Sequence, residues 1–163
     1  MIYIVIIFSF LFESMFSNIV NINSFLTPLF FLTSLSILYP YFKNKKFNFV
    51  IISIICGLLY DISFNNSAFI NTISFGMCSG LIILSYNYVS YSIYSSNFIN
   101  IINIMIYRII SYLLLCIVGV INFNELILLE GIYNSLLVNL IYGIILYIII
   151  DLISKIFNIK RVE

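Results

Sequence analysis

Histidine and tryptophan are absent from this chain, and charged residues are scarce. Charged side chains make up 8% of the 163 residues, whereas soluble globular domains carry roughly a quarter. The mean hydropathy is +1.18, and 63% of the residues are hydrophobic. Lipid can solvate a surface with so few charges, but water cannot. The composition therefore predicts an integral membrane protein with no soluble domain.

These absences also exclude several kinds of site. Without histidine, the chain lacks the commonest general base and metal ligand. Cys56, Cys78 and Cys116 lie inside apolar runs without metal-ligand spacing, which favours small buried residues over a disulfide or a zinc site. We find no Gly-rich phosphate loop and no activated nucleophile. Asp61 and Asp151 lie toward opposite membrane faces, so they cannot form the aspartate pair of a membrane peptidase. We therefore expect no enzyme activity, cofactor or metal. The net charge of +1 without a basic stripe also argues against nucleic acid as a partner.

Apolar runs separated by short polar breaks define the predicted helices. A helix needs about 20 residues at about 1.5 Å each to cross about 30 Å of hydrocarbon. Residues 1–163 are predicted to form one all-α integral membrane bundle of about six transmembrane helices, surrounded by membrane lipid. The weakest break, 90–97, holds tyrosines but no charge, so five helices remain an alternative. The predicted spans are about 2–19, 24–42, 47–64, 69–89, 97–120 and 127–153.

The basic residues near the span ends predict the orientation. Cytoplasmic loops of membrane proteins carry an excess of Lys and Arg. The basic residues form two groups, one at 43–46 and one at 155–161. Six spans place both groups on the same side of the membrane, whereas five spans would place them on opposite sides. We therefore expect a multi-pass protein of the bacterial inner (cytoplasmic) membrane with both termini in the cytoplasm. These residues are Lys43, Lys45, Lys46, Lys155, Lys160 and Arg161.

Ionisable residues inside the spans predict a polar cluster. Each costs about 2.5–3.5 kcal/mol at a helix centre, so they are expected to face one another or a polar cavity. Glu13 and Arg108 lie at matching depth, which favours an ion pair that fixes helix order over a binding role. The others lie toward the outer ends of their spans. The predicted cluster, which either binds a partner or fixes the packing, consists of Glu13, Asp61, Asn71, Arg108, Glu130 and Asn134.

Two features have competing interpretations. Asp61 ends the third span, where its carboxylate is expected to engage a partner by charge, or else to accept N–H bonds from the start of the next helix as an N-cap does. Gly76 and Gly80 form a small-xxx-small face on the fourth span. Such a face allows close helix contact, and packing inside the bundle is favoured over packing against a partner helix.

A pattern around the third span resembles a known family. It consists of Gly-Leu-Leu-Tyr-Asp at 57–61, a polar turn at 65–67 and Asn71. These residues are similar to the rod shape-determining protein MreD family, which also has short hydrophobic chains. Other features also agree with the family. They are an acidic residue in the first span (Glu13), a proline that opens the second span (Pro28), a basic loop at 43–46 and a final helix that bears Asn139. The chain has Ser53 and Phe69 where the family has glycine, and Leu29 where it often has an acidic residue.

The resemblance implies a non-enzymatic membrane subunit of the cell-elongation machinery, which builds peptidoglycan in rod-shaped cells. Its expected partners are an MreC-like single-span protein and other elongation proteins. Gly57 belongs to the family pattern and is expected to pack helices, as are Gly76 and Gly80. The alternative function is the substrate-binding subunit of an energy-coupling-factor vitamin transporter. That class needs small-residue grooves on the first helix, where this chain offers Ser9, Ser14 and Ser17 but no glycine or alanine.

Overall fold

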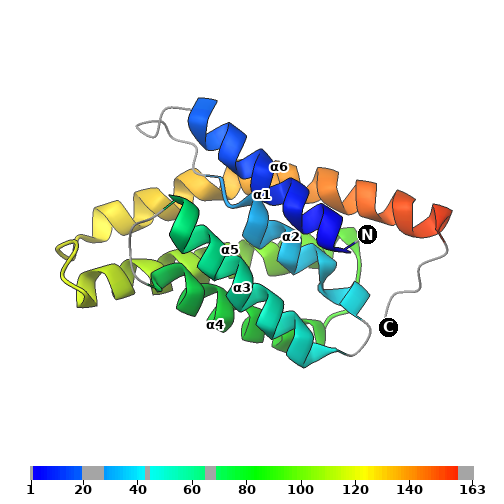
Figure 1. The fold of residues 1–163 in the computed structure, drawn as a ribbon, viewed down its shortest axis with the longest axis horizontal. Helices are drawn as coiled ribbons and strands as arrows, with labels where there is room; N and C mark the ends of the chain where they lie inside the picture. Colours follow the sequence, from blue (N-terminus) through cyan, green and yellow to red (C-terminus); the bar gives the residue numbers. More distant parts are fainter. Residues whose placement is uncertain (1, 20–27, 43–44, 65–68, 158–163) are drawn as a thin grey trace.

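A computed structural model describes residues 2–19, 28–42, 45–64 and 69–157 (Figure 1). These residues form six α-helices and one short 3₁₀-helix, η1, and no strand. The all-α prediction is confirmed for this part of the chain. The elements in order are α1 (Ile2–Ile19), α2 (Phe30–Leu38), η1 (Tyr39–Phe42), α3 (Lys46–Phe64), α4 (Ile70–Tyr86), α5 (Ile93–Ile117) and α6 (Glu125–Ile156).

The helices run up and down along the long axis of the molecule, with α2 in the centre (Figure 1). Every residue of α2 is buried, and this helix packs against α1, α4, α5 and α6. Its polar side chains Thr33, Ser34 and Ser36 are fully buried with its apolar ones. The other helices therefore enclose a short helix that has no face open to the surroundings.

The distribution of side chains is that of a protein surrounded by lipid. Large hydrophobic side chains are exposed along all of the outer helices, from Ile4 on α1 to Leu152 on α6. Glu13, Asn100 and Asn139 are fully buried. Soluble monomers rarely expose apolar patches of more than a few hundred Å². Lipid tails solvate an apolar exterior, whereas Glu13 and Asn139 accept hydrogen bonds from backbone N–H groups inside the bundle.

Three of the described helices are long and apolar enough to cross a membrane. They are α3 over Lys46–Ser63, α5 and α6. The other apolar helices, Ile2–Ser17, Phe30–Phe42 and Ile70–Tyr86, are shorter. Length and composition thus support a membrane protein with at least these three spans.

The helix boundaries agree closely with the apolar runs, except at α2. The second run was predicted as a helix from about 24, but α2 begins at Phe30. Pro28 precedes the helix and does not form its first turn. Side chains of two other helices bind the backbone N–H groups of Leu29 and Phe31, as described below. Residues 20–27 lie outside the described part of the chain. The tyrosine-containing break is a turn between α4 and α5, which excludes one continuous helix there.

Basic and aromatic residues gather at one end of the bundle. The start of α3, with Lys46, and the end of α6, with Lys155, lie on the right in Figure 1. Lys155 Nζ pairs with Asp151 Oδ2 at 2.7 Å. The rings of Tyr41, Tyr91 and Tyr147 pack together at this end. Lysine and tyrosine at the end of a bundle are typical of a membrane interface. Lys43, Lys160 and Arg161 lie outside the described residues.

Candidate functional site

The closest helix contact in the site is between Gly57 on α3 and the first residues of α4. A Cβ atom at Gly57 would lie 2.6 Å from Thr72 Cα and 2.7 Å from the carbonyl oxygen of Asn71. Backbone atoms cannot move aside as a flexible side chain can. Glycine is therefore required here, because it lets the start of α4 approach the backbone of α3.

One helical turn further along α3, the Asp61 carboxylate closes this contact with four hydrogen bonds. Oδ1 accepts from the backbone N–H of Asn71 at 3.0 Å and from its side-chain amide at 2.9 Å. Oδ2 accepts from the backbone N–H of Thr72 at 2.9 Å and from its hydroxyl at 2.7 Å. A helix start has N–H groups without intrahelical partners and carries partial positive charge. Asp61 thus accepts the N–H bonds that the capping interpretation predicted. We call this contact of Gly57 and Asp61 with Asn71 and Thr72 the α3–α4 clamp.

The α3–α4 clamp extends to α5 through Asn71. The hydroxyl of Tyr107 donates a hydrogen bond to Asn71 Oδ1 at 2.6 Å, and the rings of Tyr107 and Phe75 meet edge to face. The residue before α4, Phe69, has a φ of 62°, in the left-handed region that favours glycine. Its backbone turns the chain into α4 at the position where Asp61 binds the helix start.

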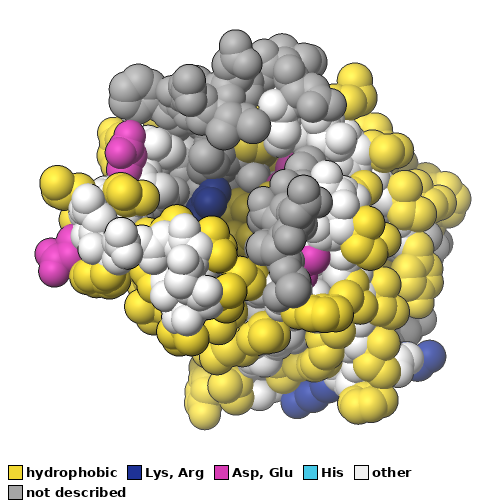
Figure 2. All heavy atoms as spheres, turned by 60° about the vertical axis from the view of Figure 1, so that its left-hand side comes forward, with side chains coloured by type: hydrophobic (Ala, Val, Ile, Leu, Met, Phe, Trp, Pro, Cys, Tyr) yellow, Lys and Arg dark blue, Asp and Glu magenta, His cyan; other side chains and the backbone are white. Residues whose placement is uncertain are grey.

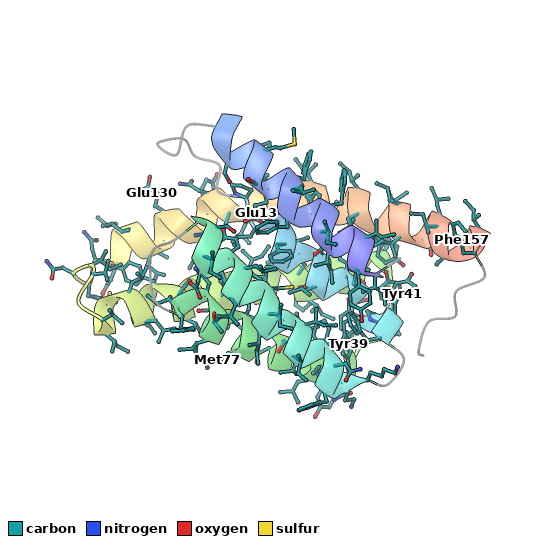
Figure 3. The ribbon with its side chains drawn as sticks, in the orientation of Figure 1. Glu13, Tyr39, Tyr41, Met77, Glu130 and Phe157 are labelled. Atoms are coloured by element: carbon teal, nitrogen blue, oxygen red, sulfur yellow. The ribbon has the colours of Figure 1, made fainter. Side chains whose placement is uncertain are left out.

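A second buried helix start lies at α2, and two distant side chains bind it. The backbone N–H of Phe31 donates to Glu13 Oε2 on α1 at 2.8 Å. The backbone N–H of Leu29 donates to Asn139 Oδ1 on α6, also at 2.8 Å. Glu13 and Asn139 are both fully buried, and Figure 3 places Glu13 inside the bundle beside α2. We call these two hydrogen bonds the α2 cap.

The predicted ion pair between Glu13 and Arg108 is not formed. Lys155 and Asp151 are the one pair within 4.0 Å among the residues that the structure describes. Glu13 binds Phe31 instead, because N–H groups at a helix start satisfy a buried carboxylate at shorter range. The Arg108 guanidinium lies 6.0 Å from the centre of the Tyr107 ring.

The structure joins some of the predicted cluster and separates the rest. Asp61 and Asn71 are hydrogen-bonded, and Arg108 is half-buried. Glu130 does not join them, because its side chain is exposed near the start of α6 (Figure 3). Asn134, one turn later, is half-buried. A position near the outer end of a span did not indicate which face of α6 carries these residues.

The two glycines of α4 differ in their surroundings. A Cβ at Gly76 would lie 3.4 Å from Ile54 Cγ1 on α3, so this glycine packs within the bundle as predicted. A Cβ at Gly80 would meet no described atom within 4 Å. The small-xxx-small face therefore makes an internal helix contact at Gly76 and not at Gly80.

A row of buried asparagines on α5 was not predicted. Asn97, Asn100 and Asn103 are nearly or fully buried and follow one face of the helix. Asn103 Nδ2 donates to Ser36 Oγ on α2 at 3.1 Å. Facing them on α6, a Cβ at Gly143 would lie 2.8 Å from Asn97 Oδ1, so α5 and α6 pack closely here. The three-residue spacing is the sequence signal for this row, since it places all three amides on one helix face.

The carboxylates at these contacts accept hydrogen bonds from the backbone N–H groups of helix starts. No group of three His, Cys, Asp or Glu side chains that could hold a metal ion occurs among the described residues. Comparison of the chain with family models, curated proteins and solved structures found no match. What the arrangement achieves is mechanical, because two carboxylates fix the relative positions of helices inside the bundle.

Proposed function

We propose that this chain is a non-enzymatic membrane subunit of the cell-elongation machinery, similar to the MreD family, and that it holds a single-span partner protein. One observation carries the proposal. Gly57, Asp61 and Asn71 are the residues of the family-like pattern, and all three lie in the α3–α4 clamp. Residues that are separated in the sequence thus have one physical purpose, which is the reason a scaffold would keep them together.

Two departures from the family pattern are compatible with this proposal. The family has glycine at the position of Phe69, and the backbone here has the positive φ that favours glycine. The family also has glycine at the position of Ser53, which is small and fully buried on α3. In both places the chain keeps the backbone or the volume that glycine provides, although the residue differs.

The proposed mechanism is positional. The α3–α4 clamp joins α3 to α4 and, through Tyr107, to α5, while the α2 cap ties α1 and α6 to the central helix. Breaking one of these contacts strands donors away from water, which costs about 1–3 kcal/mol for each group. A bundle fixed at both helix starts presents its outer faces in constant relative positions, as binding of a partner requires.

The vitamin-transporter alternative receives less support from the geometry. Docking on α1 would need small residues on its outer face. Ser9 points inward, where its hydroxyl is hydrogen-bonded to Val5 and Tyr142 and is fully buried. The outer face of α1 carries bulky side chains such as Phe8 and Leu11. Ser14 and Ser17 are half-buried, so the exposed side chains among the described ones of α1 are all bulky and form no small-residue groove.

The proposal is tested by co-purification in detergent. The chain is expressed with the coiled-coil, single-span protein of its own genome, and the amount of that protein retained per chain is measured. An unrelated single-span protein of similar size is the control. We expect stable retention of the coiled-coil protein and none of the control. Equal recovery of both, or of neither, would contradict the proposed function.

A further inference from the structure

The hairpin between α5 and α6 reaches beyond the rest of the bundle. The 32 residues of α6 are about 48 Å long at about 1.5 Å each, whereas the hydrocarbon layer is about 30 Å thick. A tilt of about 40°, at the upper end of the usual range, still leaves about 37 Å along the membrane normal. At least one end of α6 therefore lies outside the hydrocarbon.

The charges of α6 show which part lies outside. Residues 131–150 contain no charged side chain, and Glu130 and Asp151 bound this stretch. Its 20 or so residues measure about 30 Å, which matches the hydrocarbon layer. Lys155 follows Asp151 on α6, at the end of the bundle where α3 begins with Lys46. Glu130 bounds the stretch at its other end, so residues 117–130, which we call the α5–α6 tip, lie outside it; Figure 1 shows this hairpin at the left end of the molecule.

The α5–α6 tip exposes apolar side chains where lipid tails do not solvate them. Leu126, for example, is 74% exposed. At the left of Figure 2, acidic side chains project beside hydrophobic ones. Exposed apolar side chains that gather outside the hydrocarbon layer mark an interaction site. The exposed apolar side chains of the tip are Ile117, Val118, Val120, Phe123, Leu126, Ile127 and Leu129.

The tip is also a rigid structure. The hydroxyl of Tyr112 accepts from the backbone N–H of Asn124 at 2.7 Å and donates to its carbonyl at 2.9 Å. Asn124 Oδ1 caps α6 by accepting from the N–H of Leu126 at 3.0 Å. At the end of α5, Gly119 has a φ of 79°, and the N–H of Val120 donates to the carbonyl of Leu115, as in a Schellman motif. A preorganised surface binds without the cost of ordering a loop.

Charge distinguishes the possible occupants of this surface. Glu125 and Glu130 are exposed beside the apolar residues, and the described tip carries no lysine or arginine. Anionic lipid headgroups repel such a surface, and so does a second copy with the same acidic tip. A protein segment that combines apolar side chains with Lys or Arg is complementary to it.

We propose that the α5–α6 tip is the docking surface for the juxtamembrane segment of the single-span partner, through apolar contacts and basic residues that pair with Glu125 and Glu130. This inference rests on the proposed function and identifies its contact surface. It also predicts that the partner segment lies on the side of the membrane opposite Lys46 and Lys155.

The experiment compares two ends of the same helix. Leu126→Ser with Leu129→Ser changes the tip, and Ile156→Ser with Phe157→Ser changes residues of similar exposure at the other end of α6. Partner retention is measured for the full chain co-expressed with the coiled-coil, single-span protein. We expect at least a tenfold loss for the tip variant and less than a twofold loss for the other. Glu125→Lys with Glu130→Lys should also lower retention tenfold, and more so at low salt.

A photoreactive residue in place of Leu126 identifies the occupant directly and does not depend on the serine variants accumulating. An adduct with the single-span protein is expected. Adducts with lipid or with a second copy alone would overturn the inference, as would equal retention by both serine variants. Failure of the unaltered chain to retain the partner would instead remove the proposed function, and the inference with it.

Discussion

The starts of α2 and α4 face the same physical problem and solve it differently. Both lie inside the bundle, where backbone N–H groups need acceptors. At α4, Asp61 uses both carboxylate oxygens and accepts four hydrogen bonds from Asn71 and Thr72, close by in the sequence. At α2, Glu13 and Asn139 each accept one backbone N–H, from opposite ends of the chain. The α3–α4 clamp is therefore local and saturated, whereas the α2 cap is long-range and divided between two side chains.

The largest expected effect comes from separating the helices of the α3–α4 clamp. Gly57→Ala places a methyl group within 2.7 Å of the α4 backbone and moves Asp61 away from its donors. We expect the free energy of unfolding to fall by about 2–3 kcal/mol. Thermal denaturation in detergent measures the change, with Gly80→Ala as the control because that position is open. A similar loss in both variants would show that the close approach at Gly57 is not special.

The next prediction compares the two capping carboxylates by replacing each with the corresponding amide, Asp61→Asn and Glu13→Gln. Asp61→Asn replaces one carboxylate oxygen by an NH₂ group, which cannot accept the two hydrogen bonds that this oxygen accepts. We therefore expect the free energy of unfolding to fall by about 2 kcal/mol. In Glu13→Gln, the remaining oxygen can still accept from the N–H of Phe31, so the loss should stay below about 1 kcal/mol. Denaturation midpoints of the two variants are compared under the same conditions. The reverse order would contradict the distinction between a saturated and a divided cap.

The smallest effect is expected between Glu13 and Arg108. Because they are not in contact, a double-mutant cycle of Glu13→Gln and Arg108→Gln should give a coupling energy below about 1 kcal/mol. For the same reason, exchanging the two charges should not restore stability, since an arginine at 13 cannot accept from Phe31. A coupling of several kcal/mol, or recovery in the exchanged variant, would re-establish the ion pair.

The sequence predicted the local features of this fold better than the long-range ones. Apolar runs marked the helices, and the capping interpretation of Asp61 anticipated part of the α3–α4 clamp, whose members lie within 15 residues of one another. The cap of α2 could not be found in the same way. Nothing near Phe31 in the sequence indicates that Glu13 on α1 and Asn139 on α6 will reach it, since helix rotation and depth decide such contacts.

Charge positions were also incomplete guides. Matching depth suggested that Glu13 and Arg108 pair, but depth does not exclude a nearer acceptor or donor on the backbone. The asparagines of α5 could not be interpreted from their positions in the sequence either. Taken singly, Asn100 and Asn103 carry little information, and their meaning depends on the buried helix face that they share with Tyr107.

The most direct test of the α3–α4 clamp is a double-mutant cycle of Asp61→Asn and Thr72→Val, measured as free energy of unfolding in detergent. The Thr72 hydroxyl donates to Asp61 Oδ2 at 2.7 Å, so each change removes part of the same interaction. We predict a coupling energy of about 1–2 kcal/mol, within the usual range for residues in one hydrogen-bond network. Additive losses would contradict the claim that Asp61 holds the start of α4.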